Sequence, residues 1–217
     1  MSSTRRNRSR PPARGAPRLT PKPRLLVLCE GQNTEPQYIM GFRRWCRNPR
    51  VDVEIARERG VPLTLAQKAK ELKVRAERLA VREEDENLAY DEVWCVFDID
   101  VHPHVAEALQ LARDNGIKAA VSNPCVEVWL LLHFRENPGM QDRHSMQRMM
   151  RSFIRDYDKS IDFEVFKRGY ADAVRRASRL DVLAAEDGEL GRNPSTGFYL
   201  LTTSIQKGSE GFDVPSE

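Results

Sequence analysis

The chain alternates between short, continuous hydrophobic runs and longer segments in which hydrophobic residues recur on one side only. Residues 25–29 and 93–97 are continuous apolar runs, and the first is entered through Pro23 and closed by Gly31. Such runs are typical of buried strands in a sheet that is covered on both faces. Over residues 64–86, apolar positions recur every three or four residues, which predicts a charged helix with one apolar face. Strands and helices in this alternating order favour an α/β fold with a largely parallel sheet flanked by helices.

The same two patterns assign elements to the rest of the chain. Residues 34–36 have the form of a helix start, with a proline in the first turn. After Pro138 the segments become charged and helical, so residues 139–217 are predicted to be additional C-terminal helices packed on a core of residues 25–138. A small separate helical subdomain is the alternative. The predicted strands are 25–29, 51–56, 93–97 and 117–121, and the predicted helices are 34–45, 64–86, 104–114, 122–134, one around Phe153, 171–185 and 195–205.

Charge is unevenly distributed along the 217 residues. The net charge is +3, but residues 1–24 hold eight Arg and Lys and no acidic residue, which leaves −5 for residues 25–217. The basic segment is rich in Pro, Ser and Arg and has no apolar face, so we predict a disordered arm. It is either a solubilising tail or a strip that contacts nucleic-acid phosphates through residues such as Arg5, Arg6, Arg8 and Arg10.

Composition narrows the class of protein. No stretch approaches the roughly 20 apolar residues that a membrane helix needs, and the arm lacks the apolar centre of a secretory signal. The four cysteines are separated by 17, 49 and 30 residues, so no closely spaced pair suggests a zinc site or a dithiol centre. We therefore expect a reduced, cytoplasmic protein without a membrane span.

Acidic residues directly follow two of the predicted strands. Glu30 comes after the first strand, and Asp98 and Asp100 come after the strand at 93–97. Because the carboxyl ends of parallel strands lie along one edge of a sheet, these side chains are expected to converge where open α/β sheets bind ligands. Carboxylates held together repel one another unless a cation neutralises them, and Mg²⁺ or Mn²⁺ prefers such oxygen ligands. Glu35, about one helical turn beyond Glu30, is placed to reach the same ion.

Each candidate also has a simpler explanation. A lone Asp-x-Asp is common and most surface aspartate pairs are solvated turns, but the glutamate 68 residues earlier favours a metal site. His102 and His104 either touch a metal or phosphate or face solvent. Lys159 is either an electrostatic stabiliser of bound phosphate or a surface residue. Trp129 and His133, one turn apart in an apolar segment, are predicted to belong to the core.

Four stretches of the chain carry a family resemblance. They are Cys29-Glu-Gly-x-x-Thr-Glu35, Val93-Trp-Cys-Val-Phe-Asp-x-Asp100, the block 122–134, and Asn193-Pro-Ser-Thr196. Together they resemble the RloB-like proteins, which carry a Toprim-type catalytic domain, over nearly the whole chain beyond the arm. The resemblance implies a Toprim-like, doubly wound core that binds Mg²⁺ for phosphodiester chemistry. It also implies a setting in prokaryotic phage defence, commonly beside a partner ATPase.

The resemblance assigns roles residue by residue. Glu30 matches the Toprim glutamate, and Asp98 and Asp100 match its aspartate pair. Glu35 is similar to a second glutamate of the nuclease branch, and Glu127 resembles a further acidic position there. These last two are expected to complete a second metal site or to act as a general base.

One departure bears on activity. Many Toprim loops continue after the aspartate pair with a small or glycine-rich turn, whereas Val101-His102-Pro103-His104 follows here. Either the loop has been rebuilt or catalytic competence is affected. The chain itself has no phosphate-binding motif of a P-loop ATPase, so an ATPase would be a separate partner.

These residues predict a Mg²⁺- or Mn²⁺-dependent nuclease that cleaves nucleic-acid phosphodiesters. The rival from another class is a non-catalytic protein that recruits or regulates a defence ATPase. Toprim-type nucleotidyl transfer is a third alternative. When such transfer serves strand passage it needs a tyrosine nucleophile, and no motif in the sequence indicates one. The choice between DNA, tRNA and other RNA, the cleavage specificity, the trigger and the oligomeric state stay open, a homodimer being one alternative.

Overall fold

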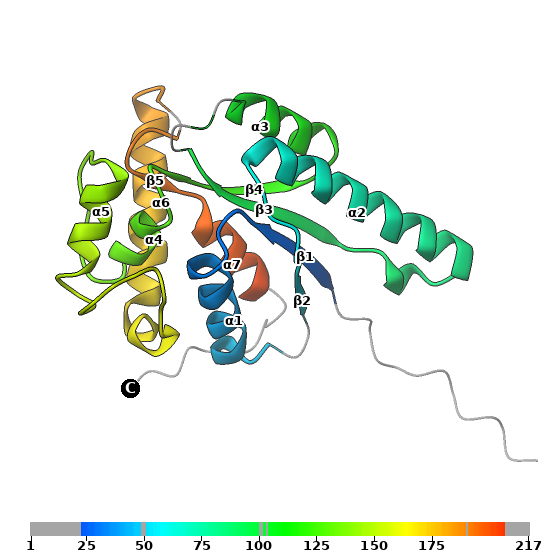
Figure 1. The fold of residues 1–217 in the computed structure, drawn as a ribbon, viewed down its shortest axis with the longest axis horizontal. Helices are drawn as coiled ribbons and strands as arrows, with labels where there is room; N and C mark the ends of the chain where they lie inside the picture. Colours follow the sequence, from blue (N-terminus) through cyan, green and yellow to red (C-terminus); the bar gives the residue numbers. More distant parts are fainter. Residues whose placement is uncertain (1–22, 49–50, 100–101, 103, 190, 207–217) are drawn as a thin grey trace, which may run out of the picture.

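A computed structural model describes residues 23–48, 51–99, 102, 104–189 and 191–206. This part of the chain forms one mixed sheet with helices on both faces (Figure 1). The strands are β1 (Arg24–Cys29), β2 (Asp52–Ile55), β3 (Glu92–Asp98), β4 (Lys118–Asn123) and β5 (Ser195–Thr196). The α-helices are α1 (Thr34–Cys46), α2 (Pro62–Glu83), α3 (Val105–Asp114), α4 (Glu127–Leu131), α5 (Arg143–Met150), α6 (Tyr170–Glu186) and α7 (Phe198–Gln206). Short 3₁₀ segments are η1 (Glu86–Leu88), η2 (Phe163–Val165) and η3 (Lys167–Gly169).

The strands lie in the order β2-β1-β3-β4-β5, and only β5 is antiparallel to its neighbour. The chain therefore runs outward from β1 to β2, then returns past β1 to β3 and continues in the opposite direction. The carboxyl ends of β1 and β3 thus form the switch point of the sheet, which is where open α/β sheets bind ligands. The α/β class and the largely parallel sheet are confirmed, and the arrangement is consistent with a Toprim-like fold.

The reversal also determines which face each helix covers. Crossovers between parallel strands are right-handed, so α1 and α2, which lead in opposite directions along the sheet, cover opposite faces. Alternate residues of β1 follow this division, because Val27 and Cys29 pack in the cluster with α1, whereas Leu26 and Leu28 pack with α2. The α1 face also carries α4, α5, α6 and α7, and the other face carries α2 and α3 (Figure 1).

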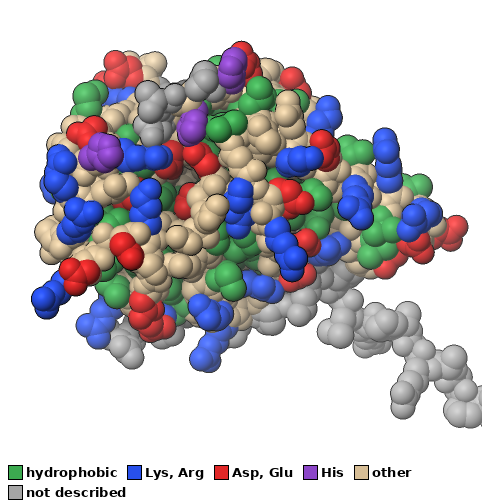
Figure 2. Space-filling view, in the orientation of Figure 1, with side chains coloured by type: hydrophobic (Ala, Val, Ile, Leu, Met, Phe, Trp, Pro, Cys, Tyr) green, Lys and Arg blue, Asp and Glu red, His purple; other side chains and the backbone are tan. Residues whose placement is uncertain are grey.

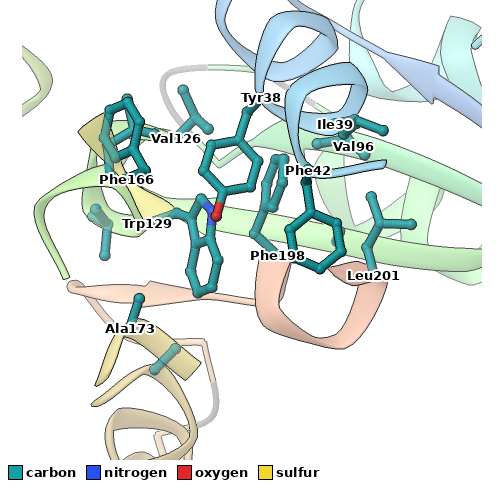
Figure 3. Close-up of a cluster of buried hydrophobic side chains, with 14 of the residues drawn as sticks. Tyr38, Ile39, Phe42, Val96, Val126, Trp129, Phe166, Ala173, Phe198 and Leu201 are labelled. Carbon is teal, nitrogen blue, oxygen red and sulfur yellow. The ribbon is translucent and has the colours of Figure 1, made fainter. Parts of the chain in front are cut away.

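An aromatic cluster fills the larger of the two layers (Figure 3). Tyr38 of α1 packs edge-on to Trp129 of α4, with ring centroids 5.8 Å apart, and Trp129 stacks on Phe198 of α7 at the same separation. His133 accepts a hydrogen bond from the Tyr38 hydroxyl at Nε2 (2.8 Å) and donates from Nδ1 to the carbonyl of Trp129 (2.9 Å). Burial lowers the pKa of His133 to about 3, so the ring is neutral. The prediction that Trp129 and His133 belong to the core is confirmed.

Two predicted helices differ from the structure. The helix expected over 122–134 is only α4, because Ser122 and Asn123 end β4 and pair with β5. The helix expected from Ser195 begins at Phe198, because Ser195 and Thr196 form β5 and the Ser122 and Thr196 hydroxyls are hydrogen-bonded at 2.9 Å. A strand of two residues has no periodicity that a sequence pattern can reveal.

Two smaller boundaries also shift. The helix expected around Phe153 is α5, which ends at Met150. Arg24, assigned to the arm, is the first residue of β1, and its guanidinium donates to the carbonyl of Leu88 at 2.7 Å. The remainder of the arm, including Arg5, Arg6, Arg8 and Arg10, lies outside the described residues. None of the described helices is long and apolar enough to cross a membrane.

Candidate functional site

The switch point brings Glu30 and Asp98 together. Glu30 follows β1, and its N–H donates to the carbonyl of Val96 in β3 at 2.9 Å. Its carboxylate accepts a hydrogen bond from the backbone N–H of Asp98 at 3.2 Å. The parallel pairing of β1 with β3 therefore places two acidic residues, 68 positions apart in the sequence, beside each other, as the strand pattern predicted.

Glu35 reaches the same place from the first turn of α1. Its side chain folds back and accepts a hydrogen bond from the N–H of Gly31 at 3.1 Å, and the residue is only 5% exposed. A Cβ atom at position 31 would lie 2.2 Å from a carboxylate oxygen of Glu35, so only glycine allows this close approach. Glycine at position 31 thus leaves room for the Glu35 side chain in the position observed.

Glu127 lines the same cavity from the start of α4. It is the first residue of α4 and is 2% exposed. Its carboxylate accepts a hydrogen bond from the hydroxyl of Tyr157 at 3.1 Å. The structure therefore brings Glu127 to the residues with which the family resemblance grouped it.

These four acidic residues line one cavity of about 240 Å³. The C-terminal region supplies part of its wall through Arg143 and Gln147 of α5 and through Lys159. Lys159 is exposed and has a left-handed backbone (φ 76°), and its carbonyl accepts a hydrogen bond from the Thr34 hydroxyl at 2.7 Å. Lys159, expected to be either an electrostatic stabiliser of bound phosphate or a surface residue, thus lies in the wall of this cavity.

Burial and mutual repulsion dominate the electrostatics of the cavity. Burial raises the pKa of Asp98 well above its usual value, the neighbouring carboxylates of Glu35, Glu127 and Glu30 raise it further, and Arg143 opposes them. Burial likewise raises the pKa of Glu35, and the nearby carboxylates of Glu127 and Glu30 raise it further. Acidic groups in this state favour either a proton or a bound cation.

Two nitrogen-bearing side chains already contact the acidic groups. Arg143 forms an ion pair with Asp98, with 2.8 Å between Nη2 and Oδ2. His102 lies 2.8 Å from a carboxylate oxygen of Glu30, measured from Nε2. His104, in contrast, pairs with Glu107 at the exposed start of α3, so of the two loop histidines only His102 reaches the site.

The donor atoms fit a hard divalent cation, because four carboxylates, one directly after β1 and the others from β3, α1 and α4, line one small cavity. Within the described residues, however, no group of three or more His, Cys, Asp or Glu is arranged to hold a metal ion as the side chains stand. Asp100, Val101 and Pro103 lie outside those residues. The aspartate pair expected from the sequence is therefore described only through Asp98.

Sequence reasoning missed Arg143 and Tyr157. Arg143 lies 45 positions after Asp98 in a charged segment without a motif, and Tyr157 lies in a turn beyond α5. Nothing in the local pattern distinguishes this arginine from the many others in the chain.

The fold and cavity define an α/β protein with an acidic site at the switch point of its sheet. The RloB-like protein family matches residues 25–205, so the chain belongs to this family. Searches of curated proteins and of solved structures found no match.

Proposed function

We propose that this chain is a Mg²⁺- or Mn²⁺-dependent nuclease of Toprim type that cleaves nucleic-acid phosphodiesters. The observation that carries the proposal is the convergence of Glu30, Glu35, Asp98 and Glu127 on one cavity at the switch point. The family resemblance supports a role as an effector of prokaryotic anti-phage defence in the cytoplasm, with a separate ATPase as partner.

The acidic residues of the site have two proposed roles. Glu30, Glu35, Asp98 and Asp100 would hold the cation, which when bound would activate a water molecule and stabilise charge on the phosphate. Glu127, positioned by the Tyr157 hydroxyl, would act as a general base or complete a second metal site.

The cationic groups have a complementary role. Arg143 and Lys159 line the same cavity as the carboxylates, and a guanidinium matches the geometry of phosphate oxygens. We expect them to orient the phosphodiester and to stabilise the negative charge that develops on it. The C-terminal region is therefore part of the site rather than a separate subdomain in this proposal.

A non-catalytic role is the second candidate. It is favoured by the partners that the acidic residues already have, because Arg143 neutralises Asp98 and His102 contacts Glu30. In that case the acidic edge is a structural ion-pair network, and the chain recruits or regulates an ATPase.

Substitution of Asp98 separates the two candidates. We expect Asp98→Asn to reduce cleavage of single- and double-stranded DNA and RNA to background, because it removes a charged ligand while keeping the side-chain shape. The measurement is cleavage with Mg²⁺ or Mn²⁺ beside circular dichroism and thermal melting. Asp114→Asn, at the exposed end of α3, is the matched control and should cleave like the wild type.

Two results would contradict the nuclease. Wild-type cleavage by folded Asp98→Asn would show that Asp98 does not take part in the chemistry. No cleavage by the wild type, with or without the partner ATPase, would favour the non-catalytic role.

A further inference from the structure

Helix α2 carries more positive charge than the chain around it neutralises. Its 22 residues include six basic and three acidic side chains. Each acidic side chain is paired with one basic side chain, and the pairs are Lys68–Glu71 (2.6 Å), Lys73–Glu77 (4.0 Å) and Arg82–Glu83 (2.8 Å). Three basic residues therefore remain without an ion pair in the described chain: Lys70, Arg75 and Arg78.

These three residues share one surface. All are exposed, and they line a single groove whose other lining residues are Val74, Leu79 and the ion-paired Glu71 and Arg82. The opposite side of α2 packs against the sheet, so the outer side is fixed in its orientation. Figure 2 shows Lys and Arg side chains spread over the surface formed by α2. The cations are thus held in a row on a rigid element.

The dimensions of the row suit a polyanion. Eight residues separate Lys70 from Arg78, which is about 12 Å along a helix. The rise per nucleotide of one strand is about 3.4 Å, so the row spans roughly three to four phosphates. Three acidic residues, 84–86, follow α2 and set the limit of the row in that direction.

The helix that carries the row begins at the edge of the sheet that holds the candidate site. β2 is parallel to β1 and β3, so its carboxyl end lies at the same edge of the sheet as Glu30 and Asp98. α2 starts seven residues after β2 and runs back toward the other edge. A strand that leaves the site over this edge can therefore continue along α2 and meets Lys70 about 12 Å from the start of the helix.

Other occupants fit less well. The basic arm of the chain and the α2 face of a second copy would both be repelled by the row. Two aliphatic side chains, Val74 and Leu79, form a small apolar surface compared with the core of a typical protein interface. Phosphate contacts need only Arg and Lys at suitable spacing.

We propose that Lys70, Arg75 and Arg78 bind the phosphate backbone of a nucleic acid outside the catalytic cavity. This inference rests on the proposed function for its substrate class, and it extends the contact surface to the α2 face of the sheet. Binding there is independent of base sequence, because phosphates carry no direct sequence information.

The test compares two triple variants of the full chain. In the first, Lys70, Arg75 and Arg78 are replaced by Gln, which keeps helix propensity. In the control, Arg44, Arg168 and Arg179 are replaced by Gln; these are exposed residues of α1, η3 and α6, on the other face of the sheet. Both triples change the net charge equally. Binding of labelled single-stranded DNA and RNA is measured by fluorescence anisotropy in EDTA, across a salt series.

We expect the α2 triple to lose roughly ten-fold or more in affinity and to flatten the salt dependence by about two log units per log unit of salt, since each lost contact contributes about 0.7 for single strands. The control should bind like the wild type. Three results would overturn the proposal: equal affinities for the wild type and the α2 triple, an equal loss in both triples, or no binding by the wild type. If an acidic protein occupies α2 instead, one of these results is expected.

The outcome is separable from that of the proposed function. Loss of binding in the α2 triple supports the α2 surface even if the wild type cleaves nothing. Cleavage that depends on Asp98, with unchanged binding by the α2 triple, would support the nuclease and reject the α2 surface.

Discussion

The two layers that cover the sheet differ in thickness and in chemistry. Within the described residues, the buried hydrophobic cluster on the side of α1 and α4 to α7 has thirty members and an aromatic centre, whereas the cluster on the side of α2 and α3 has ten members, most of them aliphatic or small. The thick layer also supplies Glu35, Glu127 and Arg143 to the cavity. The thin layer supplies no residue to it within the described chain, and it presents an excess of cations to solvent.

This difference suggests a division of labour. A site of buried carboxylates needs neighbours that are held rigidly, because any displacement of one acidic group changes the repulsion felt by the others. The aromatic layer provides that rigidity through close packing. The thin layer has no such task, so its outer face is free to carry charge.

The largest expected effect tests the packing difference. We expect Phe198→Ala, at a fully buried position stacked on Trp129, to lower the free energy of unfolding by about 3–5 kcal/mol, because it leaves a cavity between α7 and α4. Leu72→Ala, at a half-buried position of α2, should cost about 1–2 kcal/mol, since solvent reaches the vacated space. Urea denaturation of both variants measures the difference. Equal losses at unchanged m-values would show that the two layers contribute alike.

Much of the thin layer could be predicted from the sequence. The apolar positions of α2 recur every three or four residues because one face is buried and the other is not, and the helix was expected within three residues of its observed bounds. The buried runs of β1 and β3 were equally clear. In the thick layer, α1 and α6 also lie within one residue of their predicted bounds. The pattern fails there for the segment 125–133, because this segment is buried on all sides and has no polar face to mark a period.

The second prediction concerns proton binding inside the thick layer. The pKa of His133 falls from 6.5 to about 3 on folding, so the unfolded chain binds a proton at higher pH than the fold does. The stability that this group contributes is therefore present above pH 6.5 and is lost as the pH falls toward 3. Between pH 6.5 and 5 the loss is about 2 kcal/mol, at 1.36 kcal/mol per pH unit.

His133→Gln removes the titrating group while keeping a donor and an acceptor beside Tyr38 and Trp129. We expect its free energy of unfolding to vary less than that of the wild type over the same interval, in urea titrations at each pH. An identical slope for the two proteins would show that another group accounts for the acid sensitivity. For each protein, the change is measured relative to its own free energy of unfolding at neutral pH.

The local strand pattern predicts the candidate site only where a strand ends in it, whereas Glu127 was expected from the family resemblance. Glu30 and Asp98 follow buried runs directly, and Glu35 follows a glycine turn, so local sequence places all three at one edge. Arg143 and Tyr157 reach the cavity through tertiary packing of the C-terminal region, which depends on contacts more than 25 residues apart. No motif reports such contacts, and the positive partners of the acidic residues were therefore missed.

The smallest expected effect is the stabilisation of the fold by a bound metal ion, which should depend on the thick layer and not on the thin one. If the carboxylates bind Mg²⁺ or Mn²⁺ only in the folded state, the wild type gains about 1.4 kcal/mol when the free ion reaches ten times its dissociation constant. Thermal melting over a series of ion concentrations measures this gain. Asp98→Asn should lose the dependence, because it removes a ligand from the cavity. The α2 triple should keep it in full, because Lys70, Arg75 and Arg78 belong to the other layer. A wild-type melting temperature indifferent to both ions would contradict the metal site, and a dependence that survives in Asp98→Asn would assign the bound ion to a different part of the molecule.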